Sequence, residues 1–215
     1  MNLVLLGPPG AGKGTQAVKL AQTLSVVHLS SGDILRTERK NQTDLGRRAQ
    51  DYMDKGALVP DDVVLAMMMS HIDRPEAATG FVLDGFPRTV VQAKGLDQRL
   101  AAEEKRIDAV VNIDVDDAEV TKRLTGRWSC PSDGRVFHET YSPPRAAGVC
   151  DVCETTLVRR KDDEPTVVEQ RLRTYHEQTE PLVSYYRERG ALKTVDGSGS
   201  VEAVTESIRK VCRPA

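Results

Sequence analysis

The chain has 215 residues, of which 39% are apolar and 29% are charged, and its formal net charge is −2. These values predict a globular protein of one or two domains with a large core. The near balance of charges argues against a nucleic-acid binder held by bulk charge, since such proteins are usually basic. No signal-peptide pattern begins the chain and no apolar run reaches the length of a membrane span, so we expect a soluble, cytoplasmic protein with no membrane partner.

An apolar run at residues 3–6 predicts a buried strand, and a glycine-rich turn and a helix-compatible stretch follow it. The turn reads Gly7-Pro8-Pro9-Gly10-Ala11-Gly12-Lys13-Gly14-Thr15, which has the order of a phosphate-binding loop. Its glycines let backbone N–H groups converge on phosphate oxygens at a helix N-terminus, and Lys13 adds a positive charge. In the general pattern Ser or Thr follows the lysine directly, so Gly14 either weakens this prediction or narrows the family.

Further β-rich apolar runs predict strands at residues 26–29, 81–83, 109–113 and 192–195, and segments with helical spacing separate them. Strands that alternate with helices indicate an α/β fold of three layers around a five-stranded parallel sheet. In such folds ligands bind at the carboxyl ends of the strands. We therefore expect the functional loops to gather at that edge of the sheet.

Between the second and third strands, residues 30–59 form a helical excursion, in which residues 30–33 can cap a helix that runs from Ile34. Residues 60–62 then begin a further helix with an acidic first turn. We interpret residues 64–69 of that helix as core packing. From the local sequence alone, Arg36 is typical of a solvated surface residue.

The third predicted strand ends in a carboxylate and continues as Asp84-Gly85-Phe86-Pro87-Arg88-Thr89. A carboxylate at such a strand end can orient a Mg²⁺-bound water in phosphate-loop proteins. Gly85 lets the backbone approach a ligand, and Arg88 offers a planar fork to a phosphate. The alternative is a plain strand-to-helix turn capped by Asp84, but the phosphate-binding loop upstream favours a ligand site.

Cysteines form a second pattern, in the stretches Cys130-Pro131-Ser132-Asp133 and Cys150-Asp151-Val152-Cys153. Thiolate pairs at this spacing can hold a tetrahedral Zn²⁺, and Asp133 is an acceptable oxygen ligand in place of a fourth cysteine. Such an ion would be structural and remote from the chemistry. Reduced thiols in a polar network and a disulfide are the alternatives. Cys212 has no partner nearby in the sequence.

Three of these stretches together resemble adenylate kinase: the loop with a glycine before Thr15, the run Ser31-Gly32-Asp33-Ile34-Leu35-Arg36, and residues 84–89. The resemblance extends over nearly the whole chain and includes a long inserted lid. It implies the phosphate-loop nucleoside monophosphate kinase fold. The implied organisation is a core at 1–29, 60–125 and 164–215, an AMP-binding subdomain at 30–59 and a lid at 126–163.

The resemblance implies that a monomer transfers a phosphoryl group from MgATP to AMP, giving two ADP, with Asp84 holding Mg²⁺ through water. It assigns to ATP the residues Gly10, Ala11, Gly12, Lys13, Gly14, Thr15, Arg127, Val136, Phe137 and Gly199. It assigns to AMP Ser31, Arg36, Ala57, Leu58, Val59, Gly85, Phe86, Pro87, Arg88, Gln92, Arg160 and Arg171, of which Gln92 would read the adenine edge. The side chains that it assigns to catalysis are Lys13, Arg88, Arg123, Arg160 and Arg171.

The chemistry agrees with that assignment, because phosphoryl transfer mainly requires two aligned phosphates and neutralised charge. A closing lid would exclude water from the reacting phosphate. For residues 162–163, at the return of the lid, a solvated acidic turn and closure-favouring salt bridges remain open. Residues 167–188 predict one long helix, which carries Arg171 to the site.

Two other functions remain possible from the sequence. The chain could be a kinase for another nucleoside monophosphate, or one that takes GTP as its donor, because backbone contacts decide the donor. A different class is a zinc-ribbon binding module that nucleotides regulate and whose lid contacts a partner. Lys13 and Arg88, which a binding module would not need, favour the enzyme.

Overall fold

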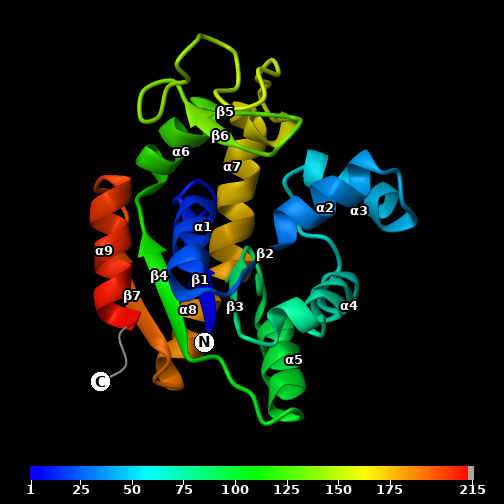
Figure 1. Ribbon diagram of the computed structural model, residues 1–215. Helices are drawn as coiled ribbons and strands as arrows, with labels where there is room; N and C mark the ends of the chain where they lie inside the picture. Colours follow the sequence, from blue (N-terminus) through cyan, green and yellow to red (C-terminus); the bar gives the residue numbers. More distant parts are fainter. Residues whose placement is uncertain (213–215) are drawn as a thin grey trace.

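The computed structural model describes residues 1–212 of the chain. A parallel sheet runs through its centre in the order β2-β3-β1-β4-β7 (Figure 1). Its strands are β1 (Asn2–Leu6), β2 (Val27–Ser30), β3 (Phe81–Asp84), β4 (Ala109–Asp114) and β7 (Leu192–Asp196). The structure confirms the five predicted strands and the parallel α/β class, and each strand end lies within one residue of its predicted position.

A hydrophobic core lies on each face of the sheet. Strand β1 contributes to both cores, because successive side chains of a strand point to opposite faces of the sheet. Val4 and Leu6 belong to the core that α4 (Asp61–Ile72), α5 (Val90–Ala101) and α8 (Pro181–Glu188) cover. Leu3 and Leu5 belong to the other core, which α1 (Lys13–Leu24), α6 (Asp117–Thr125), α7 (Pro165–Thr174) and α9 (Val201–Cys212) cover. The sheet is therefore the middle of three layers, as predicted.

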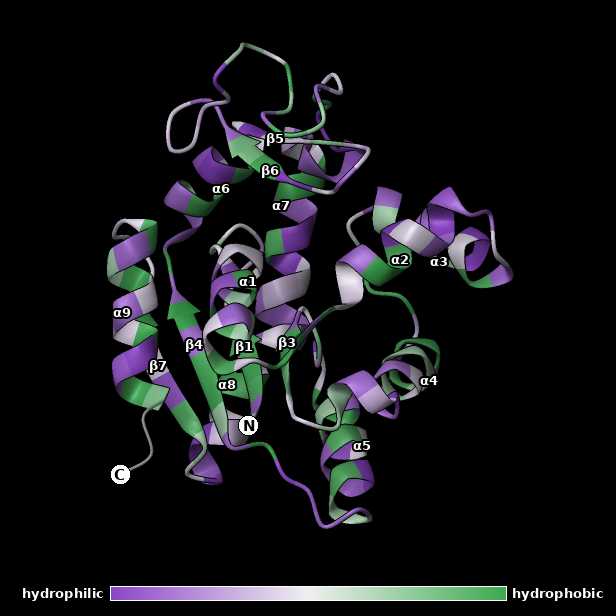
Figure 2. Ribbon diagram, in the orientation of Figure 1, coloured by the Kyte–Doolittle hydropathy of each residue, from purple (hydrophilic) through white to green (hydrophobic). Residues whose placement is uncertain are grey.

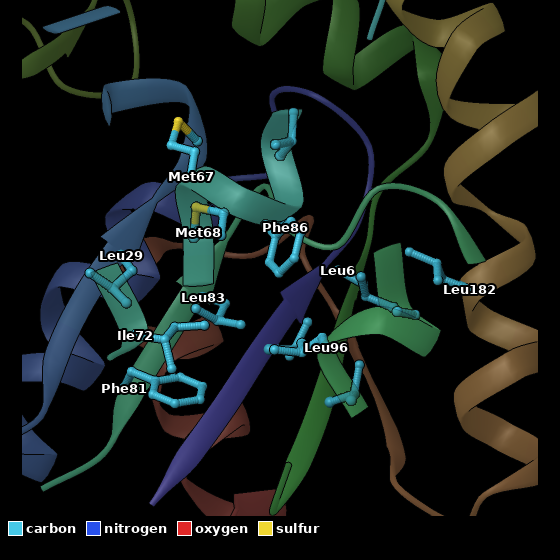
Figure 3. Packing of buried hydrophobic residues seen from close by; sticks show 14 of the residues in the cluster. Leu6, Leu29, Met67, Met68, Ile72, Phe81, Leu83, Phe86, Leu96 and Leu182 are labelled. Carbon is cyan, nitrogen blue, oxygen red and sulfur yellow. The ribbon is translucent and has the colours of Figure 1, made fainter. Parts of the chain in front are cut away.

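Figure 3 shows the first core, in which Met67 and Met68 of α4 lie near Phe86. Met68 and Phe86 are fully buried. Of residues 64–69, Val64, Met67 and Met68 are buried in this core and Leu65 and Met69 pack against it, as predicted, whereas Ala66 is exposed. The apolar residues gather on the central strands and the inner helix faces, whereas the loops at the top of Figure 2 mix hydrophilic and hydrophobic residues. None of the helices in residues 1–212 has the length and apolar character needed to cross a bilayer.

Helices α2 (Ser31–Lys40) and α3 (Asp44–Asp54) leave the sheet after β2 and lie to one side of it (Figure 1). Ser30 caps α2 by accepting a hydrogen bond from the Asp33 N–H at 3.2 Å. The helix therefore begins at Ser31 rather than at the predicted Ile34, because Ser30 is the residue whose side chain satisfies one of the free amides of its first turn. The short 3₁₀ helix η1 (Pro75–Ala77) links α4 to β3.

The segment 126–163 carries a separate two-stranded antiparallel sheet, formed by β5 (Arg127–Ser129) and β6 (Val136–His138). The sequence analysis missed this ribbon, because three-residue strands are too short to show an alternating pattern. Its small core consists of Cys130, Phe137, Cys150 and Leu157. The 3₁₀ helix η2 (Lys161–Asp163) then returns the chain to α7.

Residues 165–188 are helical, but they do not form the single regular helix that the spacing predicted. A π-helical turn, η3 (Tyr175–Thr179), separates α7 from α8. On this turn each ring nitrogen of His176 forms a hydrogen bond, Nε2 with Asp117 of α6 at 2.9 Å and Nδ1 with Glu180 at 2.9 Å. His176 thus ties the π-helical turn to the helix that leads into the lid.

The contacts of His176 with the carboxylates of Asp117 and Glu180 make a contribution to stability that depends on pH. Hydrogen bonds from His176 to Glu180 and Asp117 raise the histidine pKa above its ordinary value of 6.5. The stabilisation is therefore fully present below pH 6.5 and is lost as the pH rises through the higher, folded-state pKa. Because the His176 side chain is 44% exposed, we expect these hydrogen bonds to contribute less than about 1 kcal/mol to the free energy of unfolding.

We predict that the free energy of unfolding of the wild type, relative to His176→Gln, falls between pH 6 and pH 9. Urea unfolding at several pH values measures it. His71→Gln is the control with opposite sign: burial and Arg74 lower the pKa of His71, so the stability of the wild type relative to this variant should rise with pH, at and below pH 6.5, and the series therefore extends to pH 5. A pH-independent difference between the wild type and His176→Gln would contradict the prediction.

Candidate active site

The phosphate-binding loop joins the end of β1 to the start of α1. Gly7, Gly10 and Gly12 have positive φ values of 136°, 88° and 93°, which side chains with a Cβ rarely adopt. Among the described residues no side chain caps α1, so its first amides face the loop without a protein partner. The loop therefore has the concave array of N–H groups that binds phosphate oxygens.

Lys13 is folded back onto this loop, where its Nζ donates to the carbonyl oxygens of Gly7 at 2.7 Å and Pro8 at 2.8 Å. Burial lowers the pKa of Lys13 to about 8, against the opposing effect of Asp84, and Arg88 and Arg171 lower it further. The ammonium group is thus held near the loop by two weak acceptors, and an anion would stabilise its charge more strongly.

Asp84 ends β3 directly beside the start of α1. A Cβ atom at position 14 would lie 3.2 Å from Asp84 Oδ2, closer than almost all real Cβ contacts. Gly14 therefore leaves room for the carboxylate, which is a physical reason for the departure from the general loop pattern. His28 Nε2 is 3.7 Å from the same carboxylate oxygen and is a buried nitrogen without a hydrogen-bond partner in residues 1–212.

A pocket lies between α2, the segment 56–59 and the turn after β3. At its floor the Gly85 carbonyl accepts hydrogen bonds from Ser31 Oγ at 2.6 Å and Arg88 Nε at 2.8 Å. Gly85 has a φ of 71°, and a Cβ there would lie 2.9 Å from Ser31 Oγ. Only glycine fits this turn, which brings the Arg88 guanidinium into the pocket.

The structure brings nine of the residues predicted for AMP to this pocket, namely Ser31, Arg36, Ala57, Leu58, Val59, Gly85, Arg88, Gln92 and Arg171. Phe86 and Pro87 are buried in the core beneath it. The sequence analysis missed Leu35, Met53 and Val64, which form apolar parts of the wall. Val64 was interpreted as core packing, and Leu35 and Met53 were given no role, because a pocket lining and a core face have the same helical period.

Arginines from the lid and from α7 meet two adjacent carboxylates. Arg127 forms a bidentate pair with Asp163, at 2.7 Å and 2.5 Å, and Arg171 contacts Asp163 at 3.0 Å and Asp162 at 3.1 Å. The Asp163 side chain is only 3% exposed. Residues 162–163 therefore form ion pairs rather than a solvated acidic turn, and the prediction that these pairs favour closure of the lid stays a prediction.

The charges of this cluster affect one another, which shows how close they lie. Burial, together with the nearby Arg171, lowers the pKa of Arg88 to about 10. Burial, together with Arg127 and Arg36, lowers the pKa of Arg160 to about 9. Burial alone would raise the pKa of Asp162, but the surrounding arginines lower it. Positive groups from four segments of the chain thus converge with too few carboxylates to balance them.

The remaining predicted residues lie outside this cluster. Arg123 pairs with Glu119 on its own helix at 2.7 Å, and its guanidinium lies over the Tyr141 ring. Phe137 is buried in the lid core, whereas Val136 is 46% exposed. Gly199 is exposed in the turn before α9.

In the lid, Cys130, Asp133, Cys150 and Cys153 place one ligand atom each within 4.8 Å of one another. The Cys130 and Cys153 sulfurs are 3.3 Å apart, and Cys150 Sγ is 3.6 Å from Asp133 Oδ2. Tetrahedral zinc with Zn–S bonds of ~2.3 Å separates its sulfurs by about 3.7 Å. The four side chains therefore fit such an ion, and the three cysteines are free thiols rather than a disulfide.

A parallel sheet with a phosphate-binding loop after its first strand, a second anion pocket and an inserted lid defines a phosphate-loop nucleotide-binding protein. The adenylate kinase family model matches residues 5–191. The chain is 49% identical to the adenylate kinase of Streptomyces avermitilis, over 96% of this chain and 94% of the relative. It is 48% identical to that of Carboxydothermus hydrogenoformans, over 97% and 98%. The chain belongs to the adenylate kinase family.

The buried pair between Asp163 and Arg127 predicts a large effect of a small substitution. Asp163→Asn would leave Arg127 without its countercharge, so we expect a loss of about 3 kcal/mol in the free energy of unfolding. Urea unfolding followed by the fluorescence of Trp128, the single tryptophan, which is next to Arg127 in β5, measures it. Glu139→Gln, which breaks a half-exposed pair with Arg159, is the control and should cost less than about 1 kcal/mol. Equal losses in the two variants would contradict the prediction.

Proposed function

We propose that the protein catalyses reversible transfer of the terminal phosphoryl group of MgATP to AMP, giving two ADP. The observation that carries the proposal is the convergence of Lys13, Arg88, Arg127 and Arg171 between the phosphate-binding loop and the second pocket. Two polyanions facing each other across such a cluster would have their charge neutralised and their phosphates aligned. Family membership supports the same activity.

In this proposal ATP binds with its phosphates on residues 10–15, and AMP binds in the pocket beside Arg88. Mg²⁺ bound with ATP would neutralise part of the phosphate charge. Asp84 lies at the carboxyl edge of the sheet, where it could orient a water of that ion, and Gly14 gives the carboxylate its space. Ser31 holds the Gly85 turn, so that Arg88 points at the phosphate of AMP.

The carboxylates of residues 162–163 have a place in the same mechanism. They hold Arg127 and Arg171 close to the cleft between the phosphate-binding loop and the second pocket. The distances from the guanidinium nitrogens to the carboxylate oxygens are 2.5–3.1 Å. Phosphate oxygens would compete for these guanidinium groups, because they carry more charge in the same forked geometry. Binding of both nucleotides would thereby draw the lid down and exclude water from the transferred group.

The finer assignments belong to this proposal. The core would comprise residues 1–29, 60–125 and 164–215, the AMP-binding subdomain 30–59 and the lid 126–163. Arg123 would contact phosphate groups in catalysis, and Val136, Phe137 and Gly199 would lie beside the nucleoside of ATP. The monomeric state and the cytoplasmic location also stay predictions, which sedimentation and cell fractionation would check.

A coupled assay for ADP formation tests the activity. We expect turnover of AMP with MgATP, and little with GMP, UMP or CMP. Arg88→Ala should lose about a thousandfold in kcat/KM, as expected for an arginine that contacts the transferred charge. Arg173→Ala is the matched control, because Arg173 is 69% exposed on α7, and it should stay within about twofold.

Either of two results would overturn the proposal. Preferred turnover of another monophosphate, or with GTP as donor, would indicate the related kinase activity. No turnover by a folded protein that still binds nucleotide would favour a nucleotide-regulated binding module.

We also propose a structural Zn²⁺ held by Cys130, Asp133, Cys150 and Cys153. The support is their mutual distance and the small core around them, which holds only four buried residues. A segment with so few apolar contacts gains its order from a metal more readily than from packing. The ion would fix the β5–β6 ribbon and take no part in the chemistry.

This site predicts one zinc per chain by elemental analysis of protein purified without added metal. Cys150→Ser should lose most of the zinc and lower the melting temperature, whereas Cys212→Ser, a thiol in the last helix, should change neither. A strong chelator should reproduce the loss in the wild type and in Cys212→Ser, and should have little further effect on Cys150→Ser. Zinc-free protein whose melting temperature the chelator leaves unchanged would favour the polar network of thiols.

A further inference from the structure

The amide of Gln92 is held by the protein in one orientation. Its Nε2 donates to Asp61 Oδ1 at 2.8 Å, and its Oε1 accepts the Arg88 N–H at 2.7 Å. The Gln92 side chain is buried, with the residue 1% exposed, and it lines the pocket beside Arg88. Thr89 Oγ1 donates to the same Asp61 oxygen at 3.0 Å, so the carboxylate is itself held in place.

The two partners of Gln92 decide which end of the amide is which. An ionised carboxylate only accepts hydrogen bonds, and a backbone N–H only donates. A flipped amide would set its carbonyl against Asp61 and its NH₂ against the Arg88 N–H. Both contacts would then be repulsive or lost, and buried polar groups without partners are costly. The orientation therefore follows from the chemistry of the partners.

After these two contacts the amide keeps one N–H and one lone pair, because an amide offers two donors and two acceptor positions. Adenine presents a donor at its 6-amino group and an acceptor at N1, which match a carbonyl and an N–H of fixed orientation. A 6-oxopurine presents an acceptor and a donor in the same places. It would match only the flipped amide.

We propose that Asp61 is a specificity-determining positioning residue, which sets the amide of Gln92 to accept a 6-aminopurine monophosphate and reject a 6-oxopurine monophosphate. Asp61 does not contact the substrate itself. It lies at the start of α4 and acts on the first turn of α5, the two helices that lie together in Figure 1. The inference rests on the proposed function, since it explains how that site selects AMP.

The test compares kcat/KM for AMP and for inosine monophosphate, which carries the 6-oxo edge without a 2-amino group. Asp61→Asn replaces an acceptor-only group by one that can also donate, so the flipped amide gains a partner. We expect the ratio of AMP to inosine monophosphate to fall by about tenfold, mainly through KM. The Arg88 N–H still favours the original orientation, so some preference for AMP should remain.

Asp62→Asn is the matched control, because Asp62 is the next residue, is exposed and carries the same charge in the same helical turn. It should leave the ratio within about twofold. The second control is a double-mutant cycle: in a Gln92→Ala background, Asp61→Asn should no longer change the ratio, because its effect passes through the amide.

A purely structural role of Asp61 would lower kcat/KM for the two substrates equally and would leave the ratio unchanged. That result, or an equal effect of Asp61→Asn with and without Gln92, would overturn the inference while AMP turnover by the wild type upholds the proposed function. A wild type that does not phosphorylate AMP would overturn both. Melting temperatures of each variant show whether the fold is retained.

Discussion

The rest of the structure depends on one constraint. Several positively charged side chains have to be held close together before their ligands bind. Burial lowers the pKa values of Lys13, Arg88 and Arg171, and neighbouring arginines lower each of them further. Such a group would repel itself apart without compensation. The compensation consists of Asp84 on one side and Asp162 with Asp163 on the other. The site is thus ordered and still short of negative charge, which nucleotide phosphates can supply.

The fold explains how distant parts of the sequence contribute to this cluster of charges. The parallel sheet brings the ends of β1 and β3 to the same edge, so the phosphate-binding loop and Asp84 meet there. The lid returns through η2 into α7, which places residues 162–163 one helical turn from the start of the helix that carries Arg171. Helix α7 packs against α6, and the π-helical turn adds the His176 contact between the two stems of the lid. Charge placement and lid attachment therefore depend on the same helices.

Predictability differed between parts of the chain for physical reasons. The strands and the phosphate-binding loop were readable, because buried strands and glycine turns have local signatures. The β5–β6 ribbon was not readable, since its strands are three residues long. The π-helical turn was also missed, because its side chains follow a helical pattern on both sides. Pocket residues such as Met53 and Val64 show the same spacing as core residues, and only their position beside Arg88 distinguishes them.

By itself the sequence determined the fold class, the loop, the carboxylate at the end of β3 and the paired cysteines, because each depends on residues near one another in the chain. It also indicated the family through the order of three motifs. Tertiary structure alone decided which residues act together. The contact of Asp61 with Gln92 spans 31 positions, and that of Arg127 with Asp163 spans 36. In the sequence Asp61 is only a favourable first-turn residue of a helix. It becomes a partner of Gln92 because α4 and α5 pack side by side, and packing of that kind has no local signature.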